Sequence, residues 1–415
     1  MLTRLRSTYN EYPKTFWTLM GATFVDNLGR FLLFPYFALY LRNEFDASLV
    51  EVGILFAIFS ATSIVGSFFG GALTDKFGRK SILLFGLIAS ATSSVLMAFV
   101  DDLQVFYLLA AFVGLLSNAG GPAQQAMIAD ILPAKQLPEG YGMQRVVFNI
   151  AATVGPAVGG ILANINFFWL FIFDAVTSLI TAVIVIRVIP ETKPEATQEE
   201  EDQTFTQTMG GYGKVLRDAP FILFTLISLL VTIVYVQMNT TMPVFLFEER
   251  AIAPAGYGAL LSMNALIVVV FQFWITRRVS GRRPMLMMAL GTIFYAVGFG
   301  MFGFGSTFAY FVVAMIVITI GEMIIAPVGQ ALVAQFSPEA MRGRYMAMFG
   351  FSWGIAFAVG PLLAGYTSEG LGPNWVWYGG FILAMIGVLG YLWLQSTQGA
   401  RLKEMASLEA EGEAQ

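Results

Sequence analysis

The chain has 415 residues, of which 57% are hydrophobic and only 12% are charged, and its formal net charge is −4. This composition excludes a set of ordinary soluble domains and indicates that lipid is the main solvent of the folded chain. Cysteine and histidine are both absent. The sequence therefore excludes disulfides, thiolate chemistry and histidine-based acid–base or metal chemistry, so any proton transfer must use carboxylates.

Apolar runs of about 20 residues, the length that spans a bilayer as a helix, recur along the whole chain. They predict twelve transmembrane helices, near residues 15–41, 49–73, 81–100, 104–130, 143–163, 167–189, 219–245, 255–276, 284–304, 307–334, 345–365 and 375–395. The fold class that this pattern predicts is an all-α membrane protein.

Two polar segments interrupt the pattern. Residues 190–218 contain an acidic run at 199–202 and are expected to form a solvated cytoplasmic linker. Residues 396–415 are expected to form a polar cytoplasmic tail that is disordered or loosely helical. The sequence thus predicts two six-helix bundles, at 1–189 and 219–395, on either side of the linker.

Basic residues are distributed unequally between alternate connections. With the N-terminus inside, twenty Lys and Arg residues fall on the cytoplasmic side, and only Arg42 and Arg250 fall outside. The positive-inside rule therefore predicts a multi-pass protein of the cell (inner or cytoplasmic) membrane with both termini in the cytoplasm.

The two halves of the sequence repeat at one constant offset. A shift of 205 residues pairs Pro122 with Pro327 and Pro156 with Pro361, among ten such matches. A single offset across two predicted helices and their connection indicates that the two bundles are pseudo-symmetric copies.

The passage from Gly71 to Lys80 separates the second and third apolar runs. Its three basic residues predict a tight turn at the cytoplasmic membrane surface. The passage resembles the G-x-L-a-D-r-x-G-r-k signature of the major facilitator superfamily, which is matched here by Gly71, Leu73, Asp75, Gly78, Arg79 and Lys80. A generic basic loop, the alternative, explains the Lys and Arg residues but not the placed glycines and Asp75.

The resemblance implies the fold of that superfamily, in which two six-helix bundles rock about a central path. It also implies that the signature passage is a conformational latch. Asp75 is expected to lie near the start of the eleventh helix and to favour its positive dipole end. Arg79 is expected to pair with Asp130 at the cytoplasmic end of the fourth helix.

The fifth apolar run carries a second pattern, formed by Gly155, Pro156, Gly159 and Gly160. It resembles the antiporter motif of the same superfamily, with Ala151 in place of the first glycine, and the resemblance favours export over uptake. Small residues at this spacing also permit close helix packing, and a proline bends its helix. Plain packing is therefore the alternative interpretation.

Charged groups inside apolar runs cost about 2.5–3.5 kcal/mol each at the bilayer centre, which makes them candidates for function. Asp26 and Arg30 lie four residues apart and share a helix face that Phe34 continues. The resemblance places this pair, together with Glu322, at the central cavity; a structural ion pair is the alternative for Asp26 and Arg30. Since a low dielectric disfavours a charged carboxylate, Glu322 is the first candidate for proton coupling and Asp26, which Arg30 keeps ionised, is the second. Asp174 in the sixth run is expected to be structural.

Further polar and aromatic residues are candidates for the lining of the substrate cavity. Ordinary packing is the alternative for each of them, and two are aromatic rings that suit an apolar or cationic ligand. These candidates are Asn149, Tyr235, Gln237, Asn239, Asn264, Gln330 and Trp353.

The sequence contains no phosphate-binding lysine loop and no cluster of metal ligands. We therefore expect no enzyme activity, no ATP-driven transport and no cofactor, with the proton as coupling ion. The sequence predicts a proton-coupled secondary transporter, most similar to bacterial drug:proton antiporters, that exports drug-like or amphipathic small molecules by alternating access.

Alternatives with the same fold are a lipid or lysolipid translocator and a metabolite transporter. A non-transporting receptor or scaffold is the rival from another class, and it predicts that the intramembrane charges are dispensable. The expected partners are a small-molecule or amphipathic substrate and the lipid bilayer. No nucleic-acid partner is expected, and the protein is expected to be a monomer.

Overall fold

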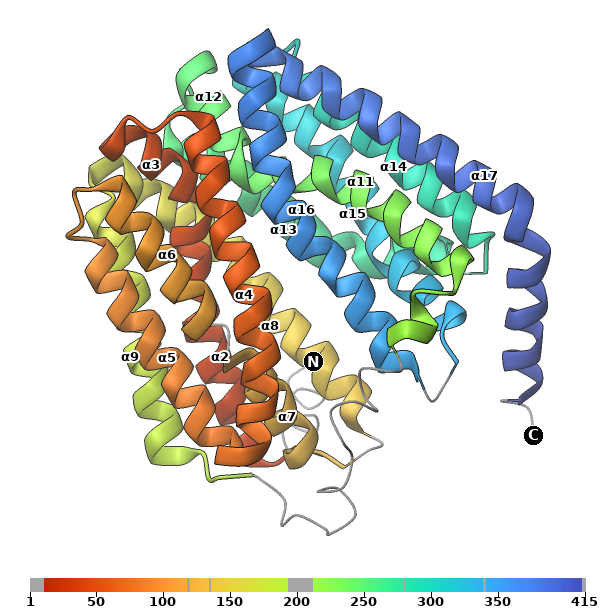
Figure 1. Cartoon of the computed structure of the whole chain (residues 1–415), viewed down its shortest axis with the longest axis horizontal. Helices are drawn as coiled ribbons and strands as arrows, with labels where there is room; N and C mark the ends of the chain where they lie inside the picture. Colours follow the sequence, from red (N-terminus) through yellow and green to blue (C-terminus); the bar gives the residue numbers. More distant parts are fainter. Residues whose placement is uncertain are drawn as a thin grey trace. The chain divides into compact units, whose positions relative to one another are not determined.

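The computed structural model describes residues 11–117, 120–133, 136–192, 212–279, 281–338 and 341–412. The side chains of residues 68, 70–72, 75, 117, 137–139, 342–343 and 398–412 are not described. All regular structure within the described ranges is helical (Figure 1).

The first part of the chain forms eight helices and one short 3₁₀ turn. These are α2 (Lys14–Leu33), η1 (Phe34–Tyr36, the 3₁₀ turn), α3 (Phe37–Phe45), α4 (Leu49–Phe77), α5 (Arg79–Met97), α6 (Leu103–Ser117), α7 (Gly120–Ile131), α8 (Leu137–Ile165) and α9 (Phe168–Val188). The later part forms α11 (Ala219–Thr240), α12 (Met242–Arg250), α13 (Pro254–Val279), α14 (Pro284–Phe302), α15 (Phe308–Phe336), α16 (Arg342–Leu371) and α17 (Asn374–Gly412). α17 continues as a helix through most of the predicted polar tail.

Eleven helical segments in the described ranges are long and apolar enough to cross a membrane. The first predicted run, 15–41, is built differently, from α2, η1 and α3 in succession. Pro35 lies at the start of η1, where it has no N–H to donate and the helix narrows to a 3₁₀ turn. Counted with this interrupted segment, the structure agrees with the predicted number of twelve, and the predicted all-α membrane fold is confirmed.

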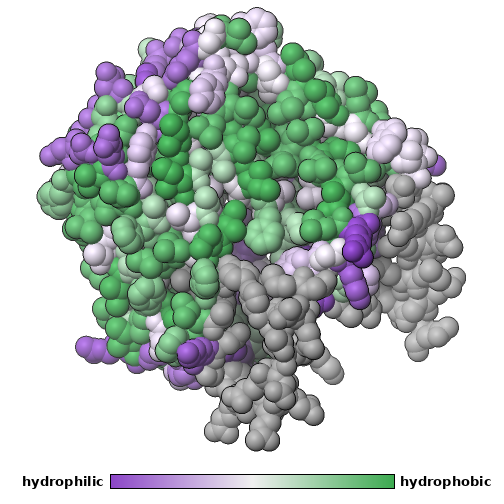
Figure 2. Space-filling view, in the orientation of Figure 1, coloured by the Kyte–Doolittle hydropathy of each residue, from purple (hydrophilic) through white to green (hydrophobic). Residues whose placement is uncertain are grey.

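The long faces of the helices are apolar at their surface. Leu108, Ile165, Phe273 and Leu389 each leave more than 60% of their accessible surface exposed. Figure 2 shows hydrophobic residues over these long faces, whereas hydrophilic residues gather near the ends of the helices. Such a surface is matched to hydrocarbon, in which a helix satisfies its own backbone hydrogen bonds.

The helix bounds repeat at the same offset as the sequence. Adding 205 to the bounds of α5 (79 and 97) gives the bounds of α14 (284 and 302), and the same shift converts α3 into α12. Both α3 and α12 end at a residue with positive φ, Asp46 (49°) and Ala251 (51°). A non-glycine residue with positive φ is uncommon, so this match indicates that the duplication extends to local backbone geometry.

The chain forms two compact units. The first contains Met1–Glu195 and Asn239–Val269, and the second contains Ala196–Met238 and Val270–Gln415. In the first unit α2 packs on α8 and α9, and α4 packs on α6; in the second, α14 packs on α15 and α17. The predicted bundles at 1–189 and 219–395 assign residues 239–269 to the second half, and this partition stays a prediction. Most of the predicted linker, residues 193–211, lies outside the described residues.

The reversal between α4 and α5 is shorter than the sequence predicts. α4 continues through Thr74 to Phe77, so that most of the passage that begins at Gly71 is helical. Gly78, with φ 97° and ψ 154°, makes the reversal alone. The turn is short because only the residue that needs positive φ has to leave the helix, and its N–H still donates to the Thr74 carbonyl at 3.1 Å.

Candidate functional site

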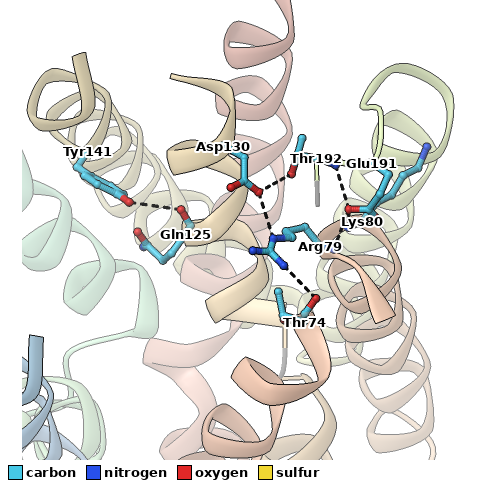
Figure 3. Close-up of polar contacts among 8 residues, drawn as sticks. All are labelled: Thr74, Arg79, Lys80, Gln125, Asp130, Tyr141, Glu191 and Thr192. Carbon is cyan, nitrogen blue, oxygen red and sulfur yellow. Dashed lines mark hydrogen bonds and ion pairs between the residues drawn. The ribbon is translucent and has the colours of Figure 1, made fainter. Parts of the chain in front are cut away.

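The reversal at Gly78 places Arg79 in a cluster of polar groups from several segments of the first unit (Figure 3). Nε of Arg79 donates to Oδ2 of Asp130 in α7 at 3.1 Å, and Nη1 donates to the Thr74 carbonyl at 3.4 Å. Asp130 also accepts a hydrogen bond from the hydroxyl of Thr192 at 3.0 Å. The ion pair that the resemblance led us to expect between Arg79 and Asp130 is therefore present, and its side chains are only 13% and 16% exposed.

Glu191, just beyond the end of α9, caps the N-terminus of α5. Its carboxylate accepts hydrogen bonds from the backbone N–H groups of Arg79 at 2.9 Å and Lys80 at 3.2 Å. The first N–H groups of a helix have no intrahelical partner, and the helix dipole favours an anion there. Nζ of Lys80 donates in turn to the carbonyl of Ile186 near the end of α9 at 2.9 Å. Two reciprocal contacts therefore connect α5 and α9.

Glu191 is not among the site residues predicted from the sequence, although one signal was available. Glu191, an acidic residue two positions after the sixth apolar run, lies on the same predicted membrane side as the turn at Gly78. Gly78 has a second role there, because a Cβ on it would collide with the Glu191 carboxylate. The side chain of Asp75 lies outside the described part of the chain, so its expected contact with the eleventh helix stays a prediction. Gly71 lies within α4.

A second polar cluster lies within the first unit, on α2 and α9. Nη2 of Arg30 lies 3.6 Å from Oδ2 of Asp26, one helical turn earlier, and the side chains are 56% and 20% exposed. The hydroxyl of Ser178 in α9 donates to Oδ1 of Asp26 at 3.2 Å. The shared face of Asp26 and Arg30 is thus present. Phe34, which was expected to continue that face, belongs to η1, and its ring meets Phe56 edge-on at 6.0 Å.

Asp174 of α9 adds a third ionisable group to this cluster. It is buried, and its Oδ2 accepts a hydrogen bond from the Ser94 hydroxyl of α5 at 2.5 Å. Gly29 lets α2 approach α9 closely, because a Cβ there would collide with Thr177 and would approach Asp174. The burial and the hydrogen bond fit the structural role expected of Asp174. Across the described residues, no group of three or more carboxylates is placed to hold a metal ion.

In the second unit, Glu322 of α15 lies among aromatic rings. The Tyr235 hydroxyl of α11 donates to Oε1 of Glu322 at 3.1 Å. The Tyr235 ring stacks on Tyr295 of α14, with centroids 5.5 Å apart, and meets Trp353 of α16 edge-on at 5.6 Å. Four helices therefore contribute to the surroundings of one carboxylate, and Trp353 remains 41% exposed.

The backbone beside Glu322 is fixed by close helix packing. Gly321 of α15 faces Gly291 of α14, and a Cβ on Gly321 would lie 2.7 Å from the Gly291 carbonyl. Small residues at such a crossing let two helices approach until their backbones touch. This contact determines the direction in which α15 presents the following residue, Glu322.

The remaining cavity candidates are divided between the two units. Gln237 is buried in the second unit, and its amide donates to the Ile233 carbonyl of its own helix at 3.0 Å. Gln330 is exposed on α15. Three other candidates belong to the first unit, and their contribution to one cavity stays a prediction; they are Asn149, Asn239 and Asn264.

The small residues of α8 lie at a close helix crossing in the first unit. The Tyr36 hydroxyl donates to the Pro156 carbonyl at 2.5 Å. A Cβ on Gly159 would collide with the α2 backbone at Leu32, and a Cβ on Gly258 of α13 would collide with the Pro156 carbonyl. Close packing therefore explains Gly155, Pro156, Gly159 and Gly160, and the export direction inferred from the antiporter motif stays a prediction.

A bidentate ion pair joins α3 and α12 within the first unit. Nε and Nη2 of Arg42 each donate to one oxygen of Glu248, both at 2.8 Å. Nη1 of Arg42 donates to the Ala47 carbonyl at 2.8 Å. From the sequence, Arg42 was used only to predict the membrane orientation, and Glu248 was not predicted as a site residue. The signal that was available is their position near the ends of equivalent helices in the two repeats.

An internally repeated set of long apolar helices, with ionisable groups placed inside them, defines a multi-pass membrane transporter. Comparison with known proteins agrees with this class. The family model described as Major Facilitator Superfamily matches residues 19–325 and 245–411, and the chain belongs to this family. It is a transporter and not an enzyme.

Two relatives and one solved structure illustrate the similarity. A Na⁺, Li⁺, K⁺/H⁺ antiporter of Planococcus maritimus is 26% identical, over 91% of this chain and 94% of the relative. The class H tetracycline resistance protein of Pasteurella multocida is 31% identical, over 45% of this chain and 48% of the relative. The crystal structure of a nucleoside transporter has the same fold, with a TM-score of 0.79 at 15% identity, over 92% of this chain and 100% of that one.

We expect Gly78→Ala to destabilise the protein by about 1–3 kcal/mol, because backbone angles of φ 97° and ψ 154° lie in a region that essentially only glycine adopts, and by a further amount through its collision with Glu191. Glu191→Ala removes only the cap and is expected to cost about 1 kcal/mol. Thermal unfolding in detergent measures both. The double variant should lose less stability than the sum of the two single variants, because without the Glu191 carboxylate the new Cβ at position 78 has nothing to collide with. Strict additivity would contradict the contact between position 78 and Glu191.

Charge reversal tests the pair of Arg42 and Glu248. Each single variant, Arg42→Glu or Glu248→Arg, places two like charges face to face and should lower the unfolding temperature, by an amount corresponding to about 1 kcal/mol or less for a partly exposed pair. The double reversal restores opposite charges and should recover at least half of the loss. A double variant as unstable as the sum of the single variants would show that the pair contributes nothing.

Proposed function

We propose that the protein is a proton-coupled antiporter that exports drug-like or amphipathic small molecules by alternating access. The observation that carries the proposal is the placement of Glu322, an acidic residue midway along an apolar helix and among the rings of Tyr235, Tyr295 and Trp353. An ionisable residue in such a position is tolerated only where it contacts partners or water, and it indicates a transport pathway.

Glu322 supplies the proton site in this proposal. Inside a membrane protein, a dry site favours the protonated, neutral form of a carboxyl group. Access of water or of a cation favours the ionised form. The Tyr235 hydroxyl, 3.1 Å from Oε1, keeps the carboxylate oriented in both states. A proton and a cationic substrate would then occupy the site alternately, because each neutralises the same charge.

Asp26 supplies a second ionisable site, in the first unit. Its carboxylate lies 3.6 Å from Arg30 and accepts a hydrogen bond from Ser178. Proton release from Glu322 and ion pairing at Asp26 would therefore take place in different units. This separation suits a mechanism in which the two halves of a transporter move against each other.

The aromatic rings around Glu322 support a substrate with an apolar body and, often, a positive charge. Ring faces attract cations, by about 0.5–2 kcal/mol each. Inward movement of one proton yields about 2.3 kcal/mol per 100 mV and about 1.4 kcal/mol per pH unit. At about 100 mV and one pH unit these two driving terms sum to about 3.7 kcal/mol, enough to concentrate a neutral substrate several hundredfold outside the cell. A monovalent cation leaves against the same potential, so the electrical term cancels and about tenfold per pH unit remains. The similarity to the tetracycline resistance protein of Pasteurella multocida supports export.

Exchange of an alkali cation for a proton is a second candidate function. It is favoured by the similarity to the Planococcus maritimus antiporter over nearly the whole chain. The oxygens of Asp26 and Asp174, with the hydroxyls of Ser94 and Ser178 beside them, are of the type that hard cations prefer. A lipid or lysolipid translocator and a metabolite transporter remain alternatives with the same fold.

Glu322→Gln tests the coupling role. In proteoliposomes with an imposed pH gradient, we expect proton-driven transport to fall to the level seen without a gradient, because an amide does not titrate. An unfolding temperature in detergent close to that of the wild type should show that the variant is folded. Glu369→Gln, the same change at an exposed position of α16, is the matched control and should transport normally. Full proton-driven transport by Glu322→Gln would refute the assignment.

A substrate panel separates the candidate functions. We expect lipophilic cationic dyes and drugs to move against their gradient in proteoliposomes when the pH gradient is imposed. Movement of Na⁺ or K⁺ with proton release, without any effect of dyes, would support the alkali cation function instead. Movement of lysolipid alone would support the lipid translocator.

A further inference from the structure

Pro327 interrupts the hydrogen bonding of α15 next to Glu322. A proline has no N–H, so the carbonyl four residues earlier loses its intrahelical donor. That carbonyl belongs to Met323, the residue directly after Glu322. The Met323 side chain is buried at 2% exposure.

Gln272 of α13 replaces the missing donor. Its Nε2 lies 3.0 Å from the Met323 carbonyl oxygen and 2.9 Å from the Thr276 hydroxyl. A side-chain amide has two N–H donors, and these two contacts use both of them. In a transmembrane helix a proline is tolerated when a neighbouring helix satisfies the released carbonyl in this way.

The surroundings of Gln272 explain why a side chain is needed for this contact. Its neighbours Phe271, Phe273 and Trp274 are 49%, 64% and 58% exposed on a face matched to hydrocarbon. Gln272 itself is partly buried and contacts α15. α13 is apolar enough to cross a membrane, and hydrocarbon offers no donor, so loss of the amide would leave the Met323 carbonyl without a donor.

We propose that Gln272 is a positioning residue for proton coupling, which fixes the orientation of Glu322 by binding the carbonyl that Pro327 releases. The proposal rests on the proposed role of Glu322. Gly321 fixes the backbone on one side of Glu322, through its contact with α14, and the Met323 carbonyl fixes it on the other. Without the Gln272 bond, the turn from Met323 to Pro327 gains freedom.

A change in this turn alters the contacts of the Glu322 carboxylate. Two titratable groups that face it are Tyr235 of α11 and Tyr295 of α14. A longer or misaligned bond from Tyr235 changes the balance between the two protonation states of the carboxylate. We therefore expect the midpoint of the pH dependence of transport to shift when Gln272 is lost.

The test is a double-mutant cycle of the full-length protein in proteoliposomes, with wild type, Gln272→Leu, Pro327→Ala and the double variant. Leucine removes both donors at similar volume. Alanine at 327 gives the Met323 carbonyl an intrahelical donor again, so that Gln272 becomes dispensable there. The pH midpoint of transport and the unfolding temperature are both measured, the second being independent of transport.

Gln272→Leu should shift the pH midpoint by about 0.4 unit or more, the shift that corresponds to an average side-chain hydrogen bond within a membrane protein. The same substitution in the Pro327→Ala background should produce less than half of that shift. Equal shifts in both backgrounds, or no shift in either, would overturn the proposal. If the two substitutions are coupled in their effect on the unfolding temperature but not on the pH midpoint, the positioning role is overturned. Glu322 would remain the proton site.

Failure of the proposed function gives a different result. If Glu322→Gln retains full proton-driven transport, the proton site lies elsewhere, and the pH midpoint no longer reports on Glu322. The cycle in unfolding temperature then still measures whether Gln272 satisfies the carbonyl that Pro327 releases.

Discussion

Hydrocarbon cannot hydrogen-bond, and this constraint acts on the polar groups within the helices of this protein. An ordinary residue in an α-helix satisfies the requirement through its own helix, so exceptions are informative. At one proline and two ionisable side chains, the structure provides a specific partner from another helix. Gln272 contacts the carbonyl released by Pro327, Ser94 contacts Asp174, and Tyr235 contacts Glu322. These partners fix which helices are neighbours and how each is rotated.

Close approach of the helix backbones is the second requirement, and glycine permits it. Partners from different helices reach each other only if the backbones come near, and in hydrocarbon this approach depends on small residues rather than on burial of apolar surface. Gly29 brings α2 to α9 beside Asp174, and Gly321 with Gly291 brings α15 to α14 beside Glu322. In both units an ionisable residue therefore lies beside a glycine contact. A small helix displacement at such a contact would change the environment of the carboxylate, which is the property that a coupled transporter needs.

The sequence predicted the features that depend on local composition. Run length and the positive-inside rule act within one segment at a time, so the twelve segments and the all-α membrane fold follow from the residues alone. The constant offset of 205 predicted the duplication, and the matching bounds of α5 and α14 agree with it. The pair of Asp26 and Arg30 was predictable because residues four apart in a helix share a face, and the pair of Arg79 and Asp130 came from the family resemblance.

Contacts between residues far apart in the chain were decided only by the tertiary structure. Glu191 caps α5 from 112 positions beyond Arg79, and Glu248 pairs with Arg42 from 206 positions away. No local pattern reports which helix end will meet a given carboxylate, because that depends on how helices of similar hydrophobicity are rotated and packed. The sequence by itself thus determined that charged groups lie inside a duplicated bundle of membrane helices. Only the packing decided which hydroxyl, amide or N–H group would satisfy each of them, because hydrogen bonding requires atoms to approach within about 3 Å.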